Sequence, residues 1–126
     1  MSLPAIHPTL EEVFLAEGTT SIGASPIPAV IVAPVAGIVS AVLASAGGTT
    51  TGTIAVAVSI NGGSDITGGL LTIAAGTGAR NNPSLGLAKV GVHAFAVSEG
   101  DVITFTPSGG GGASIPGAFA AIIRQS

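Results

Sequence analysis

The sequence predicts an all-β protein: an antiparallel β-sandwich or jelly roll of about eight short strands with an extended N-terminal arm. Three observations lead to this prediction. Apolar residues recur at every second position in several segments, which is the spacing of a strand with one buried face. Glycine- and proline-rich separators divide these segments at near-regular intervals. No window carries the periodicity of a convincing amphipathic helix.

At 126 residues the chain fits one domain. We predict an extended arm over residues 1–10 and a single β-sandwich domain over residues 11–126. The arm has neither the basic residues nor the apolar run of a signal peptide, so we expect no export signal.

Each expected strand lies between turn residues. The strands are expected at Glu12 to Ala16, Ala29 to Ala33, Gly37 to Ala44, Thr53 to Ile60, Ile66 to Ala74, Lys89 to Val97, Asp101 to Thr106 and Gly117 to Ile123. The alternation is clearest in Thr53 to Ile60, where isoleucine and valine share one face and small residues the other. Asn61-Gly62 then indicates a turn, after which Ile66 to Ala74 is expected to pair with that strand.

Charged residues are scarce in a way that indicates assembly. No residue from Gly18 to Ser64 is charged, and charged residues make up 7% of the chain, against about 25% in a typical soluble domain. The outward strand positions carry alanine, serine and threonine, which allow another surface to approach closely. We therefore expect a homo-oligomer, either a dimer or a trimer. A narrow barrel with small residues inside and outside is the alternative.

Two classes of partner are not expected. The chain has three basic residues and a net charge of −3, which leaves no basic surface for nucleic acid. The uncharged segment Ala29 to Ala46 reaches the length of about 18 residues that a membrane helix needs. However, Pro34 would break such a helix, and no Lys or Arg flanks the segment. We predict no membrane partner.

The residues that could carry chemistry are few. Glu99 and Asp101 flank Gly100, and paired carboxylates can bind calcium or act as acid and base, but such a turn is more often a solvated hairpin corner. His93 lies in an apolar strand, whereas a zinc site needs three or four converging ligands. The setting of Lys89, the one lysine, does not match the hairpin lysine of biotin or lipoate carriers. The sequence predicts no catalytic, metal or cofactor site, and the chain is not expected to be an enzyme.

A series of short motifs carries a resemblance to a known family. The motifs are Phe14-Leu15-Ala16-Glu17-Gly18, the segment Ala33 to Val39, Asn61-Gly62, the segment Leu71 to Gly76, and the segment Glu99 to Thr104. In this order and spacing, over roughly residues 12 to 124, they resemble the small decoration (cement) proteins of tailed-bacteriophage capsids.

The resemblance implies a jelly-roll domain on the outside of an icosahedral shell. Such a protein would bind the major capsid protein and stabilise contacts between its subunits, would be found in the virion, and would be assembled in the host cytoplasm. We name His7, Ala55, Ala57, Arg80 and His93 as candidate interface residues. A receptor- or carbohydrate-binding β-sandwich, such as a fibre head domain, is the alternative function.

Overall fold

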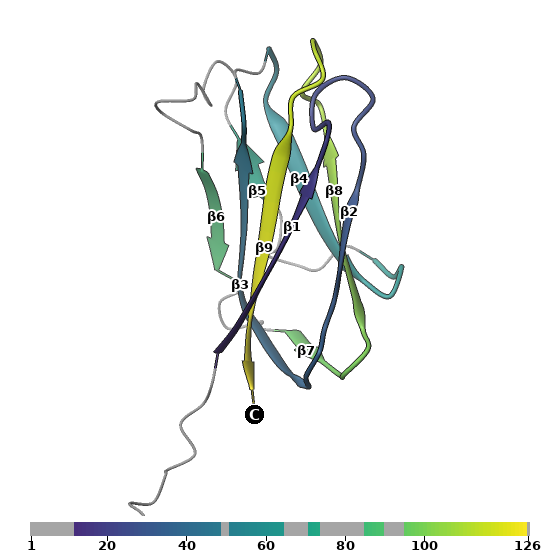
Figure 1. Cartoon of the computed structure of the whole chain (residues 1–126), viewed down its shortest axis with the longest axis vertical. Helices are drawn as coiled ribbons and strands as arrows, with labels where there is room; N and C mark the ends of the chain where they lie inside the picture. Colours follow the sequence, from purple (N-terminus) through teal and green to yellow (C-terminus); the bar gives the residue numbers. More distant parts are fainter. Residues whose placement is uncertain (1–11, 49–50, 65–70, 74–84, 90–94, 126) are drawn as a thin grey trace, which may run out of the picture.

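The protein is an antiparallel β-sandwich, as the sequence predicts. The computed structural model describes residues 12–48, 51–64, 71–73, 85–89 and 95–125, and the regular structure in this part of the chain is all strand. The strands are β1 (Glu12–Thr19), β2 (Ala29–Val32), β3 (Gly37–Ala46), β4 (Ile54–Ile60), β5 (Leu71–Ile73), β6 (Leu85–Lys89), β7 (Phe95–Val97), β8 (Val102–Ser108) and β9 (Gly117–Gln125). Most of them run roughly along the long axis of the molecule (Figure 1).

The strands form two sheets whose pairing is nested along the chain. The five-stranded sheet has the order β1-β9-β3-β6, with β7 also paired to β3, and the four-stranded sheet has the order β2-β8-β4-β5. Thus β1 pairs with β9, β2 with β8, β3 with β6 and β7, and β4 with β5, all antiparallel. The chain therefore folds back on itself, and its first strands pair with its last.

The core lies between the two sheets and is built from alternate residues of each strand. In β4, Ile54, Val56 and Val58 are fully buried while the residues between them are half-exposed, which confirms the predicted alternation. The other large core side chains are Ile22, Val39, Val42, Leu71, Ile73, Ile103, Phe105, Phe119 and Ile123. Removing this apolar surface from water is the main driving force for folding.

An aromatic contact joins the sheets at the centre of the core. Phe105 on β8 and Phe119 on β9 stack with ring centroids 5.2 Å apart and ring planes 9° apart. Both rings are buried. Such a pair adds about 0.5–1.5 kcal/mol beyond the burial of its area. This contact links the central region of the four-stranded sheet to the centre of the five-stranded sheet.

Strand β3 contains a β-bulge that the sequence pattern did not predict. Its register against β9 shifts between Val39 and Ala41, so Ser40 is the extra residue. The hydroxyl of Ser40 donates a hydrogen bond to the backbone carbonyl of Ile122 (3.3 Å). The bulge changes which residues point inward, because Val39 is buried before it and Val42 after it. Because of the extra residue, the alternating apolar positions before and after Ser40 both point into the same core.

The other predicted strands agree with the structure in part. The strand expected at Lys89 to Val97 corresponds to the last residue of β6 and to β7, and residues 90–94 lie outside the described residues. The strand Leu85–Lys89 was not predicted, because its leucines and small residues gave no strong β signal. Leu71–Ile73 pairs with β4 as expected, whereas residues 65–70 and 74, like the predicted arm at residues 1–10, lie outside the described residues.

Glycine backbones allow three loops to meet at one end of the sandwich. The N–H of Ile22 donates to the carbonyl of Ile115 (2.7 Å), and the N–H of Gly52 donates to the carbonyl of Gly110 (2.9 Å). Gly110 is buried, and a Cβ added there would lie 2.9 Å from the Ile22 carbonyl oxygen and 2.8 Å from Cγ1 of Ile54. No side chain fits at this position without displacing the backbone of a neighbouring loop.

We therefore expect Gly110→Ala to lower the free energy of unfolding by roughly 1–3 kcal/mol, as overpacking does elsewhere. The control is Gly18→Ala on β1, where the new Cβ would lie 3.4 Å from its nearest neighbour, the carbonyl oxygen of Gly117. That variant should stay within about 0.5 kcal/mol of the parent. Urea denaturation measures both, and equal midpoints for the two variants would contradict the predicted crowding at Gly110.

Candidate protein-interaction surfaces

The outer face of the five-stranded sheet is apolar over most of its length. Its members lie in four rows across β1, β9 and β3, in the order of the strand register. On these strands the rows are Gly18, Ala118 and Ser45; Ala16, Ala120 and Leu43; Phe14, Ile122 and Ala41; and Glu12, Arg124 and Ile38. The register of β6 continues the first three rows with Leu85, Leu87 and Lys89. We call this surface the groove face. Phe14, with 63% of its surface exposed, is its most exposed large apolar residue.

Side-chain size changes along the groove face. The first rows contain mainly glycine, alanine and serine, and here the surface is hollowed into an open groove of about 220 Å³. Its lining residues include Ala16, Leu43, Ser45, Ala118 and Ala120, and Phe14 forms the wall toward the larger residues. The face is therefore hollow over the small residues and raised over Phe14.

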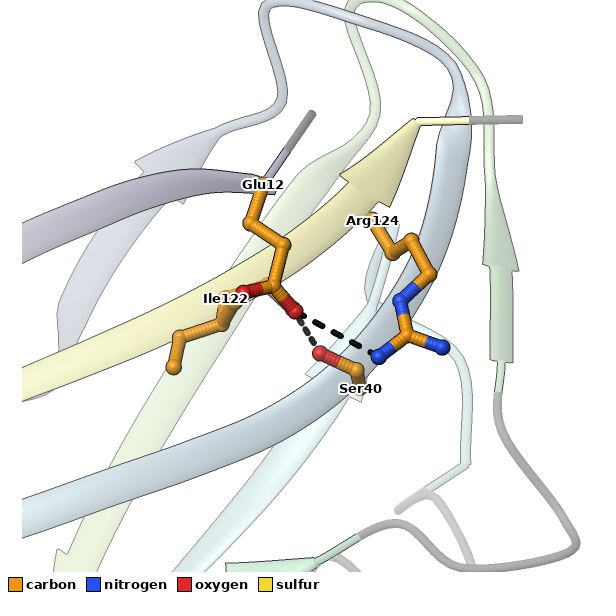
Figure 2. Close-up of polar contacts among 4 residues, drawn as sticks. All are labelled: Glu12, Ser40, Ile122 and Arg124. Atoms are coloured by element: carbon orange, nitrogen blue, oxygen red, sulfur yellow. Dashed lines mark hydrogen bonds and ion pairs between the residues drawn. The ribbon is translucent and has the colours of Figure 1, made fainter. Parts of the chain in front are cut away.

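The polar end of the groove face is shown in Figure 2. Glu12 on β1 and Arg124 on β9 are cross-strand partners, and their side chains form an ion pair of 3.5 Å. Each side chain is 52% exposed, so the pair contributes about 0–1 kcal/mol to stability. Its greater effect is that the two charges at this end of the groove face cancel each other.

The open edge of the five-stranded sheet is protected by a carboxylate. β1 lies at the end of the strand order, and Val13 and Leu15 occupy its inward positions. Glu17 takes the next inward position but is exposed, and its Oε1 accepts a hydrogen bond from the N–H of Gly18 (3.1 Å). An inward-directed charge on an edge strand disfavours pairing with a further strand. The faces are therefore better candidates for an interface than this edge.

The outer face of the four-stranded sheet carries hydroxyl and methyl groups. Its described members are Val30, Val32, Ala55, Ala57, Ser59, Thr72, Val102, Thr104, Thr106 and Ser108, and none of them is charged. We call this surface the hydroxyl face. Ala55 lies in register with Ser108 and Thr72, and Ala57 with Thr106. At the edge, Val30 and Val32 are 46% and 56% exposed.

The predicted interface residues divide into two groups. Ala55 and Ala57 lie two residues apart on β4 and are half-exposed on its outer face. His7, Arg80 and His93 lie outside the described residues. Sequence reasoning did not select Phe14, Leu43 or Ala118. The alternation in Glu12 to Ala16 placed Phe14 on one face of a strand, but the strands beside it could not be known from the sequence.

Three motifs from the sequence meet at one corner of the sandwich. The N–H of Ala33 donates a hydrogen bond to the carbonyl of Asp101, and the N–H of Gly100 donates one to the carbonyl of Ala33. Both distances are 2.8 Å. Nδ2 of Asn61 donates to Oδ1 of Asp101 (3.0 Å), and the N–H of Val102 donates to Oδ1 of Asn61 (2.8 Å). The motifs thus hold turns together.

The carboxylate of Asp101 is fixed within this corner. Its Oδ2 accepts the backbone N–H of Ser98 (2.8 Å). This bond, followed by the one from the Asn61 amide, lowers the pKa of Asp101 below its usual value of 3.8. Through these hydrogen bonds the Asp101 carboxylate has a structural role, which is to hold the neighbouring turns together. Among the described residues, no group of three or more His, Asp or Glu side chains is placed to hold a metal ion.

The lowered pKa predicts how stability depends on pH. Because the folded state favours the ionised Asp101, its contribution is complete above the unfolded pKa and is lost as the pH falls through the folded pKa. Asp101→Asn should therefore be less stable than the parent at neutral pH, and the difference should shrink below a pH of about 4. Urea midpoints of both proteins across an acid pH series measure this, and a difference independent of pH would contradict it.

The comparisons with known proteins leave the fold without an assigned family. No protein-family model, no curated protein and no solved structure matches this chain. Within the described part of the chain, no helix is long and apolar enough to cross a membrane.

Proposed function

We propose that this chain is a structural virion protein that binds the outer surface of an icosahedral phage capsid and stabilises contacts between major capsid subunits. It would be located in the virion and assembled in the host cytoplasm. The observation that carries the proposal is the hydroxyl face, a whole outer sheet surface whose described members are all uncharged.

An uncharged outer face is suited to binding another protein. The solvent-facing side of an antiparallel sheet is normally polar, and soluble domains carry many charged surface residues. A face without charges loses little solvation when another surface covers it, because burying a charge is what costs most. The exposed Val30 and Val32 supply apolar area at its edge. Hydroxyls such as those of Thr104 and Thr106 can pair with polar groups of a partner.

The strand pairing supports the finer part of the proposal, a jelly roll. The first strand pairs with the last (β1 with β9), the second with the next to last (β2 with β8), and so on to β4 with β5. This pattern is expected when one long hairpin of chain folds over into two sheets. Jelly rolls occur in viral capsid and lectin domains. This support is by analogy of fold, since one fold serves many functions. Three of the motifs that resemble decoration proteins add to it, because Ala33, Asn61 and Asp101 join the turns at one corner of the sandwich.

Modest contacts at each site are sufficient in such a role. Buried apolar area contributes about 25 cal/mol per Å² before the costs of association are subtracted. A capsid repeats the same binding surface many times, and linked binding events raise the overall affinity without new contacts. A face made of small side chains can therefore hold firmly once several copies act together.

The proposal predicts that a charge on the hydroxyl face strongly weakens capsid binding. Ala57→Lys places an ammonium group at the centre of β4 on that face, and an unpaired buried charge costs roughly 3 kcal/mol or more. We therefore expect binding to be weakened by at least about a hundredfold. The measurement is co-sedimentation with heads of the encoding tailed phage prepared without this protein.

The matched control is Ala36→Lys, which adds the same charge at an exposed turn outside the face. It should bind like the parent, and both variants should keep the melting temperature of the parent. Equal binding by the two variants would overturn the assignment of the hydroxyl face. Reproducible binding to a glycan array, with no binding to heads, would instead support the carbohydrate-binding alternative.

A further inference from the structure

We propose that the groove face binds the groove face of a second copy of this chain, related by a two-fold axis that lies parallel to the sheet and perpendicular to its strands. The axis would cross the central strand β9 at Ala121, midway between the second and third rows of the face. The resulting dimer packs two five-stranded sheets together with their strands antiparallel. This proposal does not depend on capsid binding by the hydroxyl face.

Side-chain size is the first argument. This two-fold axis keeps each strand opposite its own counterpart but reverses the order of the rows. On β1, Phe14 then faces Ala16 of the second copy; on β9, Ile122 faces Ala120. The remaining facing pairs on β1, β9 and β3 are Leu43 with Ala41, Ile38 with Ser45, Arg124 with Ala118, and Glu12 with Gly18. In each of these six pairs a larger residue faces a smaller one, as interdigitated packing requires.

The groove provides the space that the largest of these residues needs. Phe14 is 63% exposed, and the groove beyond it holds about 220 Å³ over the small residues. An apolar cavity of about 150 Å³ is large enough to bind benzene. A two-fold interface requires one surface to carry both the projecting group and its receiving site. The groove face carries both, since Phe14 and the groove lie on the same three strands.

Charge is the second argument for a second copy. The charged members of the groove face on β1, β9 and β3 are Glu12 and Arg124, which are opposite in sign and already form an ion pair, whereas Lys89 of β6 lies in register with Ala41 at the far edge of the sheet. This paired end of one copy can therefore approach a second copy without like-charge repulsion, which otherwise costs several kcal/mol across an interface. The pair lies at the end of the face, at the rim of the dimer, where polar groups keep contact with water.

The first experiment measures the native mass of the wild-type chain by sedimentation equilibrium over a dilution series. We expect twice the single-chain mass of 11.9 kDa. A mass of one chain at all concentrations would overturn the proposal. A mass of three chains would overturn it as well, because an interface in which the same patch meets itself closes with two copies.

The second experiment exchanges the sizes of one facing pair. Ala16→Phe should clash with Phe14 of the second copy, and Phe14→Ala should leave both grooves unfilled, so each variant alone should show half the native mass. Mixed in equal amounts, the two variants restore a large residue opposite a small one at both sites and should recover the two-chain mass.

The control Ala36→Phe adds the same ring at an exposed turn outside the face and should leave the dimer intact. Phe14 and Ala16 are both exposed, so circular dichroism should show an unchanged fold for every variant. Failure of the mixture to recover the dimer, or dimers formed by both single variants, would overturn the proposed pairing. Capsid binding is not measured here, so this outcome is separate from that of Ala57→Lys.

Discussion

The stack of Phe105 on Phe119 is the contact on which the arrangement of the two sheets depends. It joins β8 of one sheet to β9 of the other within a core whose other described members are aliphatic. Burying one such ring is worth about 1.5–3 kcal/mol, and the stack adds to that. Since side chains alternate along a strand, a shift of one residue in β8 or β9 would place the ring in solvent. The core thereby fixes the register of each sheet.

Once the inward positions are fixed, the outward positions are free to serve another purpose. The two outer faces differ in a way that folding does not require. The hydroxyl face is uniform, with small hydroxyl and methyl groups on β4 and β8. The groove face is graded, from Gly18 at one end of β1 to Phe14 and Glu12 at the other. A face of uniform side-chain size suits a broad partner surface. A face whose side chains grow larger from one end to the other suits a partner whose side chains change size in the reverse order.

The sequence was sufficient to predict what local alternation controls. It gave the sandwich and placed Ala55 and Ala57 on an outer face, because the pattern in β4 is unbroken. It could not reveal the bulge at Ser40, since neighbouring small residues hide the change of phase. Nor could it reveal the groove face, whose rows bring Phe14 beside Ile122 and Ala41, residues far apart in the chain. Such rows depend on long-range strand order, which turn and strand signals leave open.

The two proposed surfaces together define a geometry for a stabilising protein. The groove face and the hydroxyl face lie on opposite outer sides of one sandwich. A dimer formed through its groove faces would therefore present two hydroxyl faces, pointing in opposite directions. Such a dimer would not lie flat on a shell with both copies equally bound. It would stand between two capsid subunits and bind one with each face, so that separating the subunits would require breaking one of the hydroxyl-face contacts or the dimer itself. In this arrangement a single copy would bind one subunit, and the pair would link two.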